Sequence, residues 1–161
     1  MTDREPIDRT DDDAVAAERL AIRKRAMDLL ARREHARAEL VTKLEKRAHV
    51  AEDIDIVLDE LAAEALQSDT RYAEAAVGNK ARRGIGPVRI RAELTGAGVD
   101  DAIVYEALAN AEVDWDAMAD AARRKRFGEA LPTDYPSKAK QMRFLQRRGF
   151  DPDQLAAAFD D

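Results

Sequence analysis

Few residues in this sequence could do chemistry, and their spacing does not form a metal site. The chain has two histidines, His35 and His49, and no cysteine, which excludes disulfides and thiolate metal sites. Neither histidine lies in the HExxH or ExxH pattern that places an imidazole and a carboxylate on one helix face. We therefore interpret both histidines as capping or solvent-exposed side chains, and we predict no bound metal.

The other candidates for chemistry are better explained by structure. The Gly-Ile-Gly-Pro stretch at 84–87 lacks the lysine and the hydroxyl residue of a phosphate-binding loop, so we interpret it as a turn that opens a helix. No GxSxG nucleophile motif is present. Trp115 and Phe127 could stack on bases, but their apolar neighbours favour packing in a core. The sequence therefore indicates no catalytic residue and no cofactor, as expected for a protein that is not an enzyme.

Apolar residues recur at helical spacing, and no stretch sustains the alternation of a strand. Hydrophobic anchors also repeat along the chain, since Leu94 follows Leu44 by 50 positions and Leu145 follows Leu94 by 51. We therefore predict an all-α fold of three tandem three-helix repeats that form an elongated, curved array. The nine predicted helices span residues 14–31, 36–47, 51–65, 69–83, 87–96, 100–110, 114–127, 136–147 and 152–159.

The three repeats are predicted at 14–67, 68–112 and 113–161, after a flexible acidic tail at 1–13 that holds six acids and two arginines. Gly98 and Gly149 are expected to close the middle helices of the second and third repeats in the left-handed conformation. We expect both to serve backbone geometry rather than contacts. Helix starts are predicted from Asp caps and from prolines at first helical positions: Asp100, Asp114, Asp151, Pro87 and Pro152.

The composition is typical of solvated helices, with 45% hydrophobic, 37% charged and 5% aromatic residues. No apolar stretch is long enough for a signal peptide or a transmembrane helix, so we expect a cytoplasmic protein without membrane contact. The formal net charge is -6 and both ends of the chain are acidic. Such termini make poor association surfaces, and we expect a monomer.

Charge alternates along the chain in phase with the predicted repeats. Residues 19–48 carry ten Lys or Arg against four acids, residues 71–94 six against two, and residues 123–148 nine against two. Stacked repeats would bring equivalent helices to one side, where the bands could merge into a surface for a negatively charged partner, although any one of these side chains could simply solvate its own helix. The residues predicted to bind the partner are Arg32, Arg33, Arg37, Lys80, Arg82, Arg83, Arg89, Arg91, Arg123, Arg124, Lys125, Arg126, Lys138, Arg143, Arg147 and Arg148.

Several short motifs follow one another in a specific order. Arg-Arg-Glu-His-Ala-Arg-Ala-Glu-Leu occupies 32–40, Ser-Asp-Thr-Arg-Tyr-Ala 68–73, Arg-Ile-Arg-Ala-Glu-Leu 89–94 and Arg-Arg-Gly-Phe 147–150. From about residue 20 to the end, this order resembles the RecX family of bacterial recombinase regulators. One departure is Ala36, where the family more often has a hydroxyl residue, and its loss is expected to weaken a helix cap by about 1 kcal/mol.

The resemblance implies a non-enzymatic regulator that binds RecA nucleoprotein filaments, in or across their helical groove. It also implies suppression of ATP hydrolysis, strand exchange and repressor autocleavage. The implied partners are the RecA recombinase filament and single- or double-stranded DNA. Two alternatives stay open: a plain DNA-binding helical-repeat protein, against which the net charge of -6 weighs, and a scaffold that joins unrelated proteins, for which the sign of the charge would be unimportant.

Overall fold

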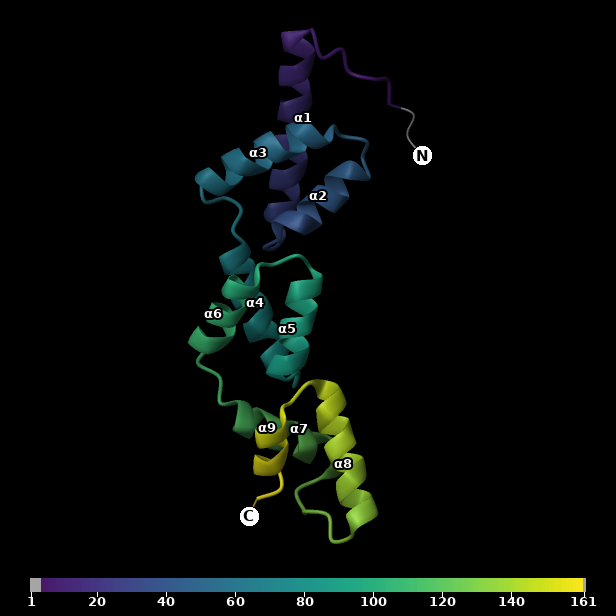
Figure 1. Cartoon of the computed structure of the whole chain (residues 1–161), viewed down its shortest axis with the longest axis vertical. Coiled ribbons are helices and arrows are strands. Elements are labelled where there is room, and N and C mark those ends of the chain that lie inside the picture. Colours follow the sequence, from purple (N-terminus) through teal and green to yellow (C-terminus); the bar gives the residue numbers. More distant parts are fainter. Residues whose placement is uncertain (1–3, 161) are drawn as a thin grey trace. The chain divides into compact units, whose positions relative to one another are not determined.

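The protein folds into helices alone in the part of the chain that its computed structural model describes, residues 4–160. No strand occurs in this range, which confirms the predicted all-α fold of nine helices. The first and last residues of each helix lie within two positions of the predicted bounds. In chain order (Figure 1), the helices are α1 (Asp12–Leu30), α2 (Arg37–Glu45), α3 (Ala51–Ala63), α4 (Asp69–Arg82), α5 (Pro87–Gly96), α6 (Asp101–Asn110), α7 (Trp115–Phe127), α8 (Tyr135–Arg148) and α9 (Pro152–Ala157).

The chain divides into two compact units. Unit 1 extends to Tyr72 and also includes Ala97–Val99, whereas unit 2 comprises Ala73–Gly96 and the chain from Asp100 onward. Helices α1 to α3 belong to unit 1 and helices α5 to α9 to unit 2, while α4 contributes residues to both. The boundaries of the three repeats stay predictions.

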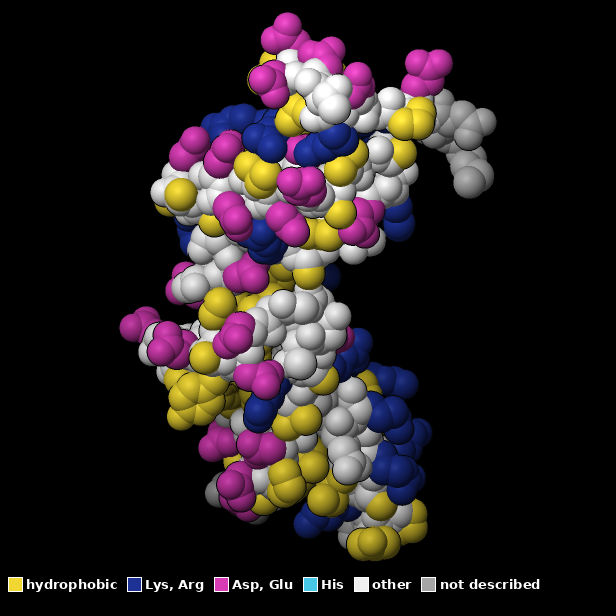
Figure 2. Space-filling model, turned by 45° about the horizontal axis from the view of Figure 1, so that its top comes forward, with side chains coloured by type: hydrophobic (Ala, Val, Ile, Leu, Met, Phe, Trp, Pro, Cys, Tyr) yellow, Lys and Arg dark blue, Asp and Glu magenta, His cyan; other side chains and the backbone are white. Residues whose placement is uncertain are grey.

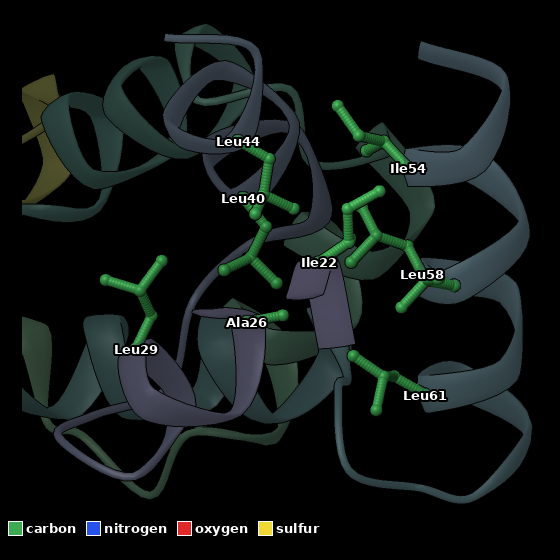
Figure 3. Packing of buried hydrophobic residues seen from close by; sticks show 9 residues of the cluster. Ile22, Ala26, Leu29, Leu40, Leu44, Ile54, Leu58 and Leu61 are labelled. Carbon is green, nitrogen blue, oxygen red and sulfur yellow. The ribbon is translucent and has the colours of Figure 1, made fainter. Parts of the chain in front are cut away.

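The core of unit 1 forms where α1, α2 and α3 pack against one another. Figure 3 shows Ile22 of α1, Leu40 of α2 and Leu58 of α3 pointing into this common core. All three side chains are fully buried, and burial of one such side chain stabilises the fold by about 1.5–3 kcal/mol. The burial of these residues agrees with the helical spacing of apolar positions in the sequence.

Helix α2 begins without a side-chain cap of its own, because its N-cap residue is Ala36. The carboxylate of Asp69, from the first residue of α4, accepts a hydrogen bond from the Arg37 amide nitrogen at 2.8 Å. The Gln67 amide group donates to the same carboxylate at 2.9 Å and to the His35 carbonyl at 3.3 Å. The cap that the sequence lacks at position 36 is therefore supplied from 32 residues further along the chain.

The expected solvent exposure or capping role of His35 is wrong, because its side chain is buried. Its Nδ1 atom lies 3.0 Å from the Arg33 carbonyl oxygen, and its Nε2 atom lies 3.2 Å from the ammonium of Lys43. A neutral ring that donates from Nδ1 and accepts at Nε2 satisfies both partners. Burial lowers the pKa of His35, and the nearby cations Arg33 and Lys43 act in the same direction.

Two arginines among the described residues before α1 pair with buried acids of α1 and α3 in unit 1. Arg4 pairs with the buried carboxylate of Glu18, and Arg9 pairs with the buried carboxylate of Asp53. Burial alone would raise the pKa of Asp53, but hydrogen bonds from Arg9 and Arg19 outweigh it and hold that pKa below its ordinary value. Of the tail predicted at 1–13, residues 1–3 lie outside the described range, and the flexibility of the tail stays a prediction.

Unit 2 packs α5 against α6, and α7 against both α8 and α9. Leu145 of α8 and Leu155 of α9 belong to one buried cluster together with Phe150 between them. The expected caps are present, since the side chains of Asp100, Asp114 and Asp151 accept hydrogen bonds from backbone amides at the starts of α6, α7 and α9. The positions of Pro87 and Pro152 as first helical residues are also confirmed.

Gly98 and Gly149 have positive φ angles of 83° and 95°, which confirms the predicted left-handed conformation. The expectation that they serve geometry rather than contacts is wrong. A Cβ atom at Gly98 would lie 2.7 Å from the Ala38 Cβ, and one at Gly149 would lie 2.7 Å from the Arg89 amide nitrogen. Both turns therefore need glycine for conformation and for close approach to a neighbouring helix start.

The turn at 84–87 opens α5, as predicted, and it also contacts the end of α8. The Gly86 amide donates to the Arg148 carbonyl at 2.8 Å, and the Val88 amide donates to the Gly149 carbonyl at 2.9 Å. A Cβ atom at Gly86 would overlap the Gly149 backbone. Two glycines thus let the start of α5 and the end of α8 form direct backbone hydrogen bonds within unit 2.

Candidate partner-binding surface

Unit 1 contains three of the predicted binding residues, and two of them already have acidic partners. Arg33 forms an ion pair with Glu39 at 2.8 Å, and its hydrogen bond lowers the pKa of Glu39. Arg37 pairs with Asp59 at 2.7 Å. Arg32 is exposed in the turn after α1. Two of the three predicted binding residues of unit 1 are therefore already neutralised by neighbouring acids.

The basic residues of α4 and α5 differ in how far acids neutralise them. Lys80 and Arg89 both bind Glu93, at 2.5 and 2.9 Å, and together they lower the pKa of that carboxyl group. Arg83 and Arg91 are exposed, and no ion pair of either occurs among residues 4–160. These two arginines are therefore better placed for a partner than Lys80 or Arg89.

Arg123 does not belong to a binding surface, and its assignment from the sequence is wrong. The side chain is fully buried, and its Nε atom donates to the Ala158 carbonyl at 3.0 Å. Its Nη atoms donate to the carbonyls of Ala130 and Glu129 at 3.3 and 3.4 Å. Arg123 therefore joins the start of the 128–134 loop to the end of α9 and holds a structural position.

The remaining cations of α7 and α8 lie at the surface. Arg124 pairs with Asp120 at 2.7 Å and with Glu129 at 2.6 Å. Lys138 lies over the Phe159 ring, 5.6 Å from its centre, whereas Arg143 and Arg147 are exposed on α8. Figure 2 shows Lys and Arg side chains gathered over the flank of unit 2 that carries α8, and acidic side chains over the flank that carries α6.

Five predicted binding residues from two separate charge bands meet around one pocket in unit 2, which we call the basic pocket. It has a volume of about 280 Å³ and lies between the end of α4, helix α7 from Met118 onward and the end of α8. Its apolar floor is formed by Met118, Ala122 and Phe144. The five basic residues that surround this floor are Arg82, Arg83, Lys125, Arg126 and Arg148.

Helix ends and aromatic rings explain why so many cations gather around this pocket. Arg82, Lys125, Arg126 and Arg148 all lie in the last turn of a helix, where a positive side chain interacts favourably with the helix dipole. The Arg148 guanidinium lies 5.3 Å from the centre of the Phe144 ring and donates to the Arg83 carbonyl at 3.3 Å. Arg148 is therefore held in place before any partner binds.

Sequence patterns did not identify the floor of the basic pocket. Met118 and Ala122 lie one turn apart on α7, and Phe144 comes from α8, so only the packing of α7 on α8 brings them together. Phe127, which the sequence assigned to a core, packs edge to face against Phe144 with ring centres 5.3 Å apart. Trp115 is half-buried at the start of α7.

The described residues contain no group of His, Asp and Glu side chains placed to hold a metal ion. None of the helices between residues 4 and 160 is both long enough and apolar enough to cross a membrane. The basic pocket and the exposed arginines near it are therefore the most distinctive chemical feature of the described surface.

Fold and surface together define an all-helical repeat protein with a strongly basic pocket. The chain belongs to the RecX family. It matches the models of the first, second and third three-helix domains of RecX at residues 23–61, 68–108 and 112–159.

Curated relatives support the same assignment. The regulatory protein RecX of Halorhodospira halophila is 49% identical over 138 residues, which make up 86% of each chain. The regulatory protein RecX of Pseudomonas savastanoi pv. phaseolicola is 45% identical over 136 residues, 84% of this chain and 88% of the relative. The curated relatives therefore agree with the family models that the chain belongs to the RecX family.

Solved structures share the fold. RecX from Lactobacillus salivarius matches 89% of this chain and 95% of its own length, with a TM-score of 0.76 and 22% sequence identity. A second crystal structure of a regulatory protein RecX matches the whole chain and 83% of its own length, with a TM-score of 0.77 and 20% identity. At such identities the likeness supports the fold alone.

Proposed function

We propose that this chain binds a RecA nucleoprotein filament and lowers the ATPase, strand-exchange and coprotease activities of the filament without being an enzyme itself. Through the filament it would restrain DNA recombination, DNA repair and the SOS response. A cytoplasmic location is part of the same proposal, because these processes act on chromosomal DNA.

The observation that carries the proposal is the charge of unit 2 in a member of the RecX family. Arg83, Arg91, Arg143 and Arg147 are exposed, and the ion pairs of residues 4–160 leave all four without an acidic partner. An extended assembly with negative phosphates or acidic surfaces would be attracted to them. Unit 1 would contribute less, because Arg33 and Arg37 are already paired.

The alternative is a plain DNA-binding protein, and direct binding measurements distinguish the two. Binding of the purified chain is compared for bare single-stranded DNA, for recombinase alone and for the assembled filament, each across a salt series. We expect the filament to be bound most tightly and its ATP hydrolysis to fall. Equal affinity for bare DNA, with a steep salt dependence and no inhibition, would favour the alternative.

Charge reversal locates the surface. The double variant Arg143→Glu with Arg147→Glu should keep its helical content, since exposed substitutions usually change stability by about 0.5 kcal/mol or less, but it should inhibit the filament far less. Lys24→Glu with Lys46→Glu is a matched control, because both lysines are exposed in unit 1 and the net charge changes equally. If both double variants inhibit as well as the parent does, the basic residues of α8 only solvate their helix.

A further inference from the structure

The basic pocket combines an apolar floor with positive walls. The floor consists of Met118, Ala122 and Phe144, and none of the residues that line the pocket is acidic. A group that fills it must therefore offer apolar surface to the floor and negative charge to the walls. Methionine is well suited to such a floor, because its flexible thioether adapts to side chains of different shape.

We propose that the basic pocket binds an acidic segment of a partner protein that carries one bulky apolar side chain, with the apolar group on the floor and the neighbouring carboxylates on the surrounding arginines and lysines. The volume of about 280 Å³ lies just below the range of roughly 300–1,000 Å³ that holds drug-sized ligands. It therefore suits a single side chain with its adjoining backbone.

The lining favours a peptide over a nucleotide. Every base carries hydrogen-bonding groups on its edge, and apart from the Lys and Arg side chains the pocket offers only Ala, Gly, Met and Phe side chains. The Phe144 ring packs edge to face against Phe127 and beneath Arg148, which holds it in place as part of the floor. The arginines can bind the carboxylates of an acidic peptide in bidentate geometry.

This inference deepens the proposed function, since it rests on that function for the identity of the partner but not for the chemistry of the pocket. The test uses the full chain and a fluorescent synthetic peptide in which one phenylalanine lies among aspartates and glutamates. A peptide with serine in place of phenylalanine and a fluorescent oligothymidine are measured in parallel by anisotropy. We expect the phenylalanine peptide to bind about ten-fold more tightly than the serine peptide, or better.

Two substitutions separate the floor from the walls. Ala121 lines the pocket but is exposed, so Ala121→Leu should fill the pocket without disturbing the core, and it should weaken binding of the phenylalanine peptide by about ten-fold. Ala109→Leu is the matched control on α6, outside the pocket, and should bind like the parent. Lys125→Glu should weaken both peptides through charge.

The proposal is overturned if Ala121→Leu binds the phenylalanine peptide as tightly as Ala109→Leu does. It is also overturned if Ala121→Leu abolishes binding of oligothymidine while leaving peptide binding unchanged, which would assign the pocket to nucleic acid. The proposed function is measured separately by filament inhibition. If the parent inhibits the filament but does not bind the peptide, only the proposal for the pocket is refuted. If the parent binds the peptide but does not inhibit the filament, only the proposed function is refuted.

Discussion

Replacement of Gly149 by alanine should destabilise unit 2 by about 3 kcal/mol. The left-handed conformation at φ 95° costs a residue with a β-carbon roughly 1 kcal/mol. The new Cβ atom would also conflict with Arg89, so the start of α5 would have to move away from the end of α8. That movement breaks the two backbone hydrogen bonds from Gly86 and Val88, each of which contributes about 1 kcal/mol.

Two other glycines provide matched controls. Gly84 also has a positive φ, 77°, and an added Cβ there would meet only the Ala122 Cβ at an ordinary distance of 3.6 Å, so Gly84→Ala should cost only the conformational part, about 1 kcal/mol. Gly96 is in helix α5 with open space around it and no positive φ. Gly96→Ala should therefore leave stability unchanged or raise it by less than about 1 kcal/mol.

Urea denaturation followed by tryptophan fluorescence measures the free energy of unfolding of unit 2, because the only tryptophan of the chain, Trp115, lies in α7 of that unit. Far-ultraviolet circular dichroism of the same samples checks that each variant is helical before denaturant is added. A domain of the size of unit 2 loses roughly 4–8 °C in Tm for each kcal/mol of lost stability, so thermal melts give a second measurement of the destabilisation. Equal losses for Gly149→Ala and Gly84→Ala would refute the close approach of α5 and α8.

Four further predictions concern both units and the assembly state. Stability of unit 1 should fall as the pH drops from about 6.5 toward 5, because folding lowers the pKa of His35 whereas the unfolded chain binds the proton near the ordinary pKa. In a pH series of urea melts, His35→Gln should flatten this part of the curve. Asp69→Ala should cost about 1 kcal/mol in urea melts by leaving the start of α2 uncapped, and adding Ala36→Ser should restore part of the loss. Arg123→Met should destabilise unit 2 by about 2–4 kcal/mol through unpaired buried carbonyls, whereas exposed Lys125→Met should change the fluorescence midpoint little. Sedimentation at moderate salt should give a monomer, and a stable dimer would contradict this expectation.

The helices could be predicted from the sequence because their signals are local. Apolar spacing, Asp caps and prolines at first helical positions depend on residues within one or two turns, and the observed helices agree with them. The cap of α2 shows where local reasoning ends. Ala36 correctly predicted a missing side-chain cap, but the replacement by Asp69 depends on a contact across 32 residues that no local pattern encodes.

The error at Arg123 has a different origin, because a local signal was present. Four basic residues follow one another at 123–126, and their composition indicated a common surface. Arg123 lies one helical turn after buried Ala119, so the helical period places it on the inner face of α7. Its long side chain reaches carbonyl groups at the start of the 128–134 loop and at the end of α9. Periodicity should therefore take precedence over composition when single residues of a basic run are assigned.

The two turn glycines show that the sequence repeat is also a repeat of packing. Gly98 approaches Ala38 at the start of α2, and Gly149 approaches Arg89 at the start of α5, so both partners of the contact shift by 51 residues. The same contact is thus formed twice, which means that the repeat describes packing as well as sequence. In the second contact the helix start carries Arg89 and the helix end carries Arg148, so one glycine turn joins two basic segments. Loosening that turn by Gly149→Ala should therefore disturb the basic pocket as well as the stability of unit 2, and weaker binding of the acidic peptide by the folded variant would connect the two effects.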